Sequence, residues 1–190
     1  MNSVPSTVAG LAEQLRRVRT EAENFASNTP ESIAVWRPGP SSWTIAECFE
    51  HLALFNRTYL KAMTLALQSA EPTEPNQTRA RPGIFGRMFV GSMEPPARAY
   101  TKTKASGTTT PATGLSLAVA FADFFDSHQQ IEGLLETSQQ FSLEKIKFAN
   151  PFLKGLRPRL ATGFHILAVH ERRHLWQASV LRRQAEQARC

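Results

Sequence analysis

The chain has little cysteine and no long apolar segment. Its 190 residues include two cysteines, Cys48 and Cys190, which cannot build the disulfide framework of a small secreted domain. The N-terminal segment lacks the basic stretch and apolar run of a secretory signal peptide. The longest apolar stretch, 115–125, covers about half of a membrane span and contains Asp123. These absences predict a soluble, cytoplasmic protein with no membrane partner.

Acidic residues are fewer than basic ones, but the excess positive charge is spread along the chain. The formal net charge is +6, and the isoelectric point is near 9.8. A nucleic-acid-binding protein would combine such charge with an aromatic-interleaved basic motif or a glycine-rich phosphate loop. The arginines instead lie in separate groups around 16–19, 79–87 and 172–183. We interpret them as a solvated surface and expect no nucleic-acid partner.

Apolar residues recur at spacings of three and four over four long segments, which is the pattern of amphipathic helices. We expect helices over about residues 7–26, 44–69, 116–138 and 159–185 of a single domain, 1–190. Thr44 and Glu47 form a capping-box pattern at the start of the second helix. No segment convincingly shows the pattern of a strand. The sequence therefore predicts an all-α fold, a four-helix bundle with long crossover connections.

The segment 71–114 is different in composition. It holds six prolines and five glycines, which predicts an irregular loop with at most a short helical turn over 84–90. A connection of this length in a compact domain is usually functional or mobile. We expect it to cross over between the second and third helices and to shape the substrate pocket.

Two histidines of the last predicted helix, His170 and His174, stand four residues apart. Residues at this spacing share one helical face, so both imidazoles can reach a single ion. His51 lies about two turns into the second helix, at the edge of its apolar face. Three neutral imidazoles on two helices would leave coordination positions open, as in catalytic metal sites. The competing interpretation is three ordinary buried histidines.

Two neighbouring polar residues are candidates for supporting roles. Gln177 lies one turn after His174, where it can orient a ligand imidazole or a bound water, although core polar packing explains it equally well. Glu47 lies one turn before His51 and is a candidate for the same task, but its capping role already explains it.

The residues 170–174, HERRH, also match the motif of zinc proteases. Glu171 lies about 100° around the helix from His170, and the longer continuation with a third histidine is absent, so a protease is not favoured. His128 belongs to a polar string and is expected to face water. His165 lies about 140° around the helix from His170 and is not expected to bind the same ion.

Two sequence signatures resemble those of the DinB-like (YfiT-like) superfamily, in the same order and at the same spacing over nearly the whole chain. A proline-bearing middle segment followed by a lysine is also similar. The matching residues are Arg37-Pro38 with Trp43-x-x-x-Glu47-x-x-x-His51-Leu52, then Glu94-Pro95-Pro96, then His170-x-x-x-His174-Leu175-x-Gln177.

The resemblance implies a four-helix bundle, frequently a homodimer, that holds one divalent ion with His51, His170 and His174. Zinc or nickel is the expected ion, with iron or manganese as alternatives. Superfamily members include thiol transferases that use bacillithiol and a mycothiol-dependent maleylpyruvate isomerase, and others are classed as metal-dependent hydrolases. The resemblance thus implies a small-thiol S-transferase-like or hydrolase-like enzyme that acts on a small molecule through a thiol or a water bound to the ion. A low-molecular-weight thiol is among the expected small-molecule partners. The alternative is a non-catalytic metal-binding or stress-associated bundle protein.

Overall fold

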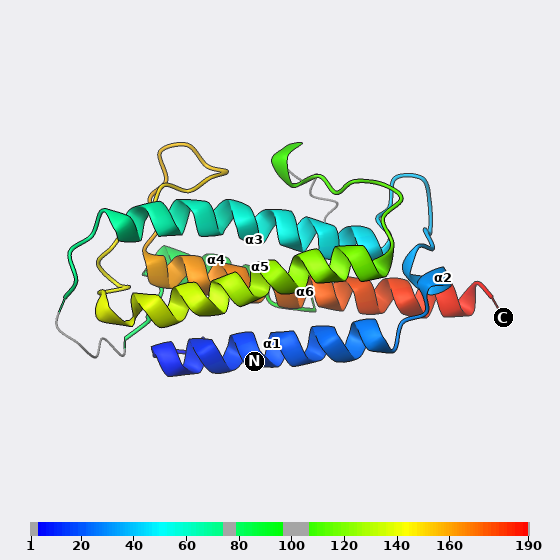
Figure 1. The fold of residues 1–190 in the computed structure, drawn as a ribbon, viewed down its shortest axis with the longest axis horizontal. Helices are drawn as coiled ribbons and strands as arrows, with labels where there is room; N and C mark the ends of the chain where they lie inside the picture. Colours follow the sequence, from blue (N-terminus) through cyan, green and yellow to red (C-terminus); the bar gives the residue numbers. More distant parts are fainter. Residues whose placement is uncertain (1–3, 74–78, 97–106, 190) are drawn as a thin grey trace.

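The computed structural model describes residues 4–73, 79–96 and 107–189, and the regular elements of this part are helices (Figure 1). The long helices are α1 (Val8–Ser27), α3 (Ile45–Gln68), α5 (Leu117–Thr137) and α6 (Leu160–Gln187). The all-α bundle predicted from the sequence is confirmed. Cys190 and parts of the predicted loop 71–114 lie outside the described residues.

The four long helices form a bundle in which neighbours in sequence are not all neighbours in space. Helix α3 packs against both α5 and α6, and α1 packs against the same two helices. Helices α1 and α3 therefore occupy opposite corners, as do α5 and α6 (Figure 1). Helices α3 and α5 run in the same direction, so the chain between them must return along the bundle (Figure 1). This return is a long crossover connection.

Side-chain caps fix where helices α1 and α3 begin. At α1, Thr7 Oγ1 accepts a hydrogen bond from the Gly10 N–H at 3.1 Å. At α3, Thr44 Oγ1 accepts from the Glu47 N–H at 3.1 Å, while Glu47 Oε2 accepts from the Thr44 N–H at 2.9 Å. These contacts satisfy amide donors that have no partner within the first turn of a helix. The expected capping box is therefore present at α3.

Shorter helices lie in the connections. Helix α2 (Glu31–Ala34) follows Pro30, and α4 (Ile84–Met93) is longer than the turn expected over 84–90. Helix α4 packs on α6, and a Cβ added at Gly86 would lie 2.5 Å from Thr162 Cγ2. The absence of a side chain at Gly86 thus permits this close approach. A short 3₁₀ turn, η1 (Gly107–Thr109), packs against α3, and another, η2 (Ser138–Gln140), follows α5.

The buried apolar residues form two clusters, one toward each end of the bundle. Each long helix contributes to both clusters. The change from one cluster to the other falls between Leu15 and Val18 in α1, Ala53 and Tyr59 in α3, Phe124 and Ile131 in α5, and Val169 and Leu175 in α6. Between the clusters lies a set of buried polar residues, here called the polar layer: Asn56, Ser127, His128, His170, Glu171 and His174. His170 and His174 of α6 thus sit at the boundary between two apolar cores.

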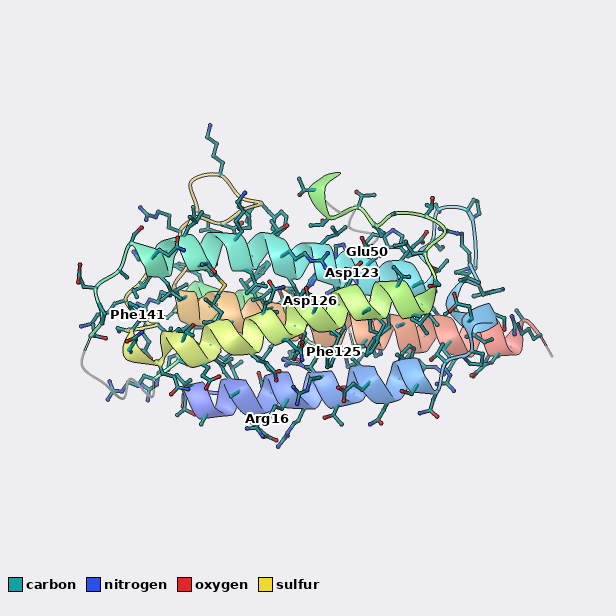
Figure 2. All side chains as sticks on the ribbon, in the orientation of Figure 1. Arg16, Glu50, Asp123, Phe125, Asp126 and Phe141 are labelled. Carbon is teal, nitrogen blue, oxygen red and sulfur yellow. The ribbon has the colours of Figure 1, made fainter. Side chains whose placement is uncertain are left out.

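The outer seam between α3 and α5 carries charged side chains, among them Glu50, Asp123 and Asp126 (Figure 2). Arg57 Nη2 lies 2.6 Å from Asp123 Oδ1 and 3.9 Å from Asp126 Oδ2. Burial raises the pKa of the Glu50 carboxyl, and the charge of Asp123 raises it further. Exposed ion pairs contribute about 0–1 kcal/mol to stability, so this seam depends mainly on its apolar contacts.

Among the described residues, no helix combines the length and the apolar character that crossing a lipid bilayer requires.

Candidate metal centre

Helices α3 and α6 bring His51, His170 and His174 together. The ring centroid of His51 lies 5.2 Å from that of His170 and 4.6 Å from that of His174, and the two rings of α6 are 4.5 Å apart. One ring nitrogen of each residue lies within 4.8 Å of the others. Two nitrogens that ligate the same tetrahedral zinc ion are about 3.4 Å apart. Side-chain rotations that bring the nitrogens closer by at most about 1.4 Å would let the three rings reach one ion.

The three rings are buried and kept neutral. His51, His170 and His174 are 5%, 7% and 9% exposed. Burial lowers the pKa of each imidazole, and the neighbouring rings and Arg173 lower the pKa of His170 and His174 further. A neutral imidazole offers a lone pair to a cation, whereas an imidazolium does not. The environment thus favours the protonation state that a metal ligand requires.

A backbone carbonyl fixes the proton of His51. The Nδ1–H of His51 donates to the carbonyl oxygen of Thr109 at 2.7 Å, and Thr109 lies in η1. Because the proton is held on Nδ1, the lone pair of the neutral ring is on Nε2. Sequence reasoning did not single out Thr109, since a carbonyl partner leaves no signature in the pattern of side chains.

Two ring nitrogens of the cluster have no protein partner among the described residues. They are Nδ1 of His170 and Nδ1 of His174, both of which are buried. Burying a polar atom without a hydrogen bond costs free energy. Three adjacent neutral rings with incompletely satisfied nitrogens are a donor set that suits a divalent cation. The residues present therefore fit a bound ion.

Aromatic side chains enclose the cluster. The ring of Trp43 lies 4.7 Å from that of His51 and 6.0 Å from that of His174. Phe55 stacks on His170 with 3.8 Å between centroids, and its other contacts include Phe152 at 5.1 Å. Apolar walls exclude water and strengthen electrostatic interactions within a site.

The two supporting candidates occupy different positions. The Glu47 carboxylate pairs with Arg37 Nη2 at 2.5 Å and with the Thr44 N–H, so its contacts are those of the cap and the preceding turn. Gln177 lies one turn after His174 on α6, and its side chain raises the pKa of His174 slightly, although burial leaves that pKa lowered overall. Gln177 is thus placed where it can orient a ring of the cluster.

Two further residues with side chains that can bind metals, His165 and Cys48, do not belong to the cluster. The Nε2–H of His165 donates to the carbonyl oxygen of Ala80 at 2.8 Å, on another side of α6. Cys48 is fully buried, and burial raises the pKa of its thiol, with the charge of Glu47 adding to the effect. A thiol in this state is unreactive, which agrees with a packing role.

The expectation that His128 faces water is wrong. His128 is fully buried, and its Nδ1 lies 3.0 Å from Oε2 of Glu171, which is also fully buried. Burial alone lowers the pKa of His128, but the Glu171 carboxylate outweighs it and the pKa is raised. The polar string around His128 concealed this position, because sequence polarity does not reveal a polar partner on another helix.

The residue pattern that defines the DinB superfamily matches this chain over residues 14–178, which include all three clustered histidines. The chain belongs to the DinB superfamily. None of the curated proteins and none of the solved structures compared with it gives a match. This DinB superfamily protein therefore has a three-histidine cluster that is compatible with metal binding.

Proposed function

We propose that this DinB superfamily protein is a metal-dependent enzyme that activates a small nucleophile at a divalent ion held by His51, His170 and His174. The supporting observation is the convergence of three neutral imidazoles from two helices. Three protein ligands leave a coordination position for a substrate, as in catalytic zinc sites, whereas structural zinc sites have four. The proposed ion is zinc or nickel, with iron or manganese as alternatives.

A divalent ion in this place supplies Lewis acidity, which lowers the pKa of a thiol or water that shares it. The chain's own residues prepare the site. The Thr109 carbonyl keeps the lone pair of His51 on Nε2. Gln177 lies one turn from His174, where it can orient that ring, and Phe55 covers His170 against water. Of the two activities, we favour transfer of a low-molecular-weight thiol over hydrolysis, because the superfamily that this chain resembles includes thiol transferases.

Metal analysis of purified protein tests the ligand set. We expect about one ion per chain in the unmodified protein and almost none in His170→Ala, because two imidazoles hold a divalent ion weakly. The matched control is His165→Ala, which removes a buried histidine of the same helix outside the cluster and should keep the ion. Equal metal content in both variants, or none in the unmodified protein, contradicts the proposed site.

The reaction is tested with metal-loaded protein, a panel of bacterial thiols and an electrophile. Thiol consumption that disappears in His170→Ala supports thiol transfer. If no thiol is consumed but an ester or an amide is hydrolysed, the result supports a hydrolase and contradicts thiol transfer. Absence of both in a protein that retains its ion excludes the enzyme.

A non-catalytic, metal-stabilised bundle is the second candidate, and the deep burial of all three rings favours it. A structural metal contributes folding free energy. A large fall in melting temperature on chelation, with no binding of thiol or substrate, supports this candidate. An unchanged melting temperature excludes it.

We also propose that the protein is a cytoplasmic homodimer, as its resemblance to the superfamily implies. Light scattering during size-exclusion chromatography gives the molar mass in solution, and a value for one chain at micromolar concentration contradicts the dimer.

A further inference from the structure

The polar layer contains a hydrogen-bonded network centred on Glu171. The Glu171 carboxylate lies 2.8 Å from Asn56 Nδ2 of α3 and 3.0 Å from His128 Nδ1 of α5. Asn56 Nδ2 also donates to Ser127 Oγ at 3.1 Å. All four side chains are fully buried. One carboxylate thus joins three helices inside the bundle.

The network extends to the fourth long helix. Glu132 Oε1 lies 3.8 Å from His128 Nε2, on the side of the ring opposite Glu171. The other carboxylate oxygen of Glu132 accepts from Arg19 of α1 at 2.9 Å. The groups that face Glu171 therefore come from every long helix of the bundle, directly or through His128.

The network joins the same two helices that carry the histidine cluster. Glu171 follows His170 in α6, and Asn56 lies five residues after His51 in α3, or about 7.5 Å along the helix axis. Glu171 projects about 100° around α6 from His170. Fixing the direction of Glu171 therefore fixes the angle at which His170 and His174 face α3. His128 braces Glu171 from α5, at the corner diagonal to α6.

Apolar packing alone specifies this geometry weakly, because apolar cores tolerate repacking. A rotation of α6 or a slip along α3 would separate Glu171 from its partners and leave a buried carboxylate unpaired, which is strongly unfavourable. Single buried polar groups fix the register of coiled coils in the same way. The network therefore opposes the displacements that would move the imidazoles apart.

We propose that Glu171, held by Asn56 and His128, is a positioning residue that sets the rotation and register of α6 against α3, so that the three imidazoles converge before any ion arrives. This inference rests on the proposed metal site and not on the reaction that the site performs.

The first test compares zinc affinity, measured by competition with a chelator, in two destabilised variants. Glu171→Gln keeps the size of the side chain but places an amide donor among the donors of Asn56 and His128. We expect zinc binding at least about tenfold weaker, the range seen when groups that orient metal ligands are removed. The control Leu135→Ala creates a cavity in α5, away from the network, and should keep zinc affinity within about twofold at a similar loss of stability.

The second test separates positioning from stability. The triple variant Asn56→Leu/His128→Phe/Glu171→Met replaces the network by apolar residues of similar volume, a change that is often neutral or stabilising. We expect it to fold with a melting temperature near that of the unmodified protein and to bind zinc at least about tenfold more weakly. Unchanged zinc affinity in this variant, or in folded Glu171→Gln, overturns the inference.

A third readout uses metal-free protein, so that failure of the metal site and failure of the inference are distinguishable. Nuclear magnetic resonance contacts between the rings of His51, His170 and His174 report their convergence without an ion. We expect these contacts in the unmodified protein and in Leu135→Ala, and their loss in Glu171→Gln and in the triple variant. If the unmodified protein binds none of the proposed divalent ions, the proposed function fails. The ring contacts alone then decide the inference, and contacts retained in the triple variant overturn it.

Discussion

Gly163 of α6 is packed closely against side chains of neighbouring segments. A Cβ added at Gly163 would lie 2.8 Å from both Met63 Sδ and Phe148 Cε1. Met63 and Phe148 are themselves buried, so neither can move away freely. We expect Gly163→Ala to lower the free energy of unfolding by about 1–3 kcal/mol through overpacking. This loss should exceed the gain of about 1 kcal/mol that alanine brings to a helix interior.

The matched control is Gly133→Ala in α5, where an added Cβ has no neighbour within 4 Å. This change should raise the free energy of unfolding by about 0.5–1 kcal/mol, because alanine favours the helix and nothing is displaced. Urea denaturation of both variants measures the difference. Equal stability of the two variants would show that Gly163 is not packed as the structure has it.

At the same scale, the sequence made some residues of the polar layer easy to find and concealed others. The spacing of His170 and His174 is visible in the chain because a helix places both on one face. The burial of His128 and Glu171 is not visible, because each is polar and becomes acceptable in the core only through its partner on another helix. Pairing between elements is the information that a single sequence lacks.

The packing of α4 on α6 depends on Gly86. A Cβ there would lie 2.5 Å from Thr162 Cγ2 and 2.7 Å from its Oγ1, and this oxygen accepts a hydrogen bond from the Gly83 N–H. We expect Gly86→Ala to lift α4 from α6 and to speed amide hydrogen exchange across α4 by about tenfold or more. Exchange detected by mass spectrometry measures this effect.

Gly91 in the same helix provides the comparison. An added Cβ at Gly91 meets no atom within 4 Å, so Gly91→Ala should leave the docking intact and slow exchange in α4 through better helix propensity. Faster exchange in Gly91→Ala than in Gly86→Ala would contradict the assigned contact.

Among the elements, periodicity and caps predicted the long helices because each buries an apolar face. The full length of α4 was not predicted, because its glycines have low intrinsic helix propensity. Packing on α6 outweighs the low helix propensity of these glycines. Gly86 itself permits the packing, because a Cβ there would clash with Thr162. Helix α2 was missed because its four residues are too few for a periodic signal.

The molecule as a whole should lose stability in mild acid when it carries no metal. Burial lowers the pKa of His51, His165, His170 and His174 in the folded protein. Below about pH 6.5 the unfolded chain takes up protons that the folded protein does not, so the unfolded state is favoured. We expect urea denaturation with a chelator present to show a fall of at least about 1.4 kcal/mol per pH unit below pH 6, which is the effect of one net proton.

His128 contributes to the pH dependence of stability with the opposite sign. Its pKa is raised in the fold, so its contribution is present below about pH 6.5 and is lost as the pH rises through the folded-state value. The four histidines whose pKa is lowered outweigh His128. The free energy of unfolding should therefore still rise with pH. Stability that is flat or rising toward pH 5 would contradict the neutral state of the clustered rings.

The separation of the apolar residues into two clusters gives the bundle a natural plane of division. Each half can keep its own backbone hydrogen bonds while the other half opens, so the metal-free protein should show two levels of protection against hydrogen exchange. A cation shared by α3 and α6 at this boundary would couple the halves. Loading the ion would then turn two partly independent folding units into one cooperative unit.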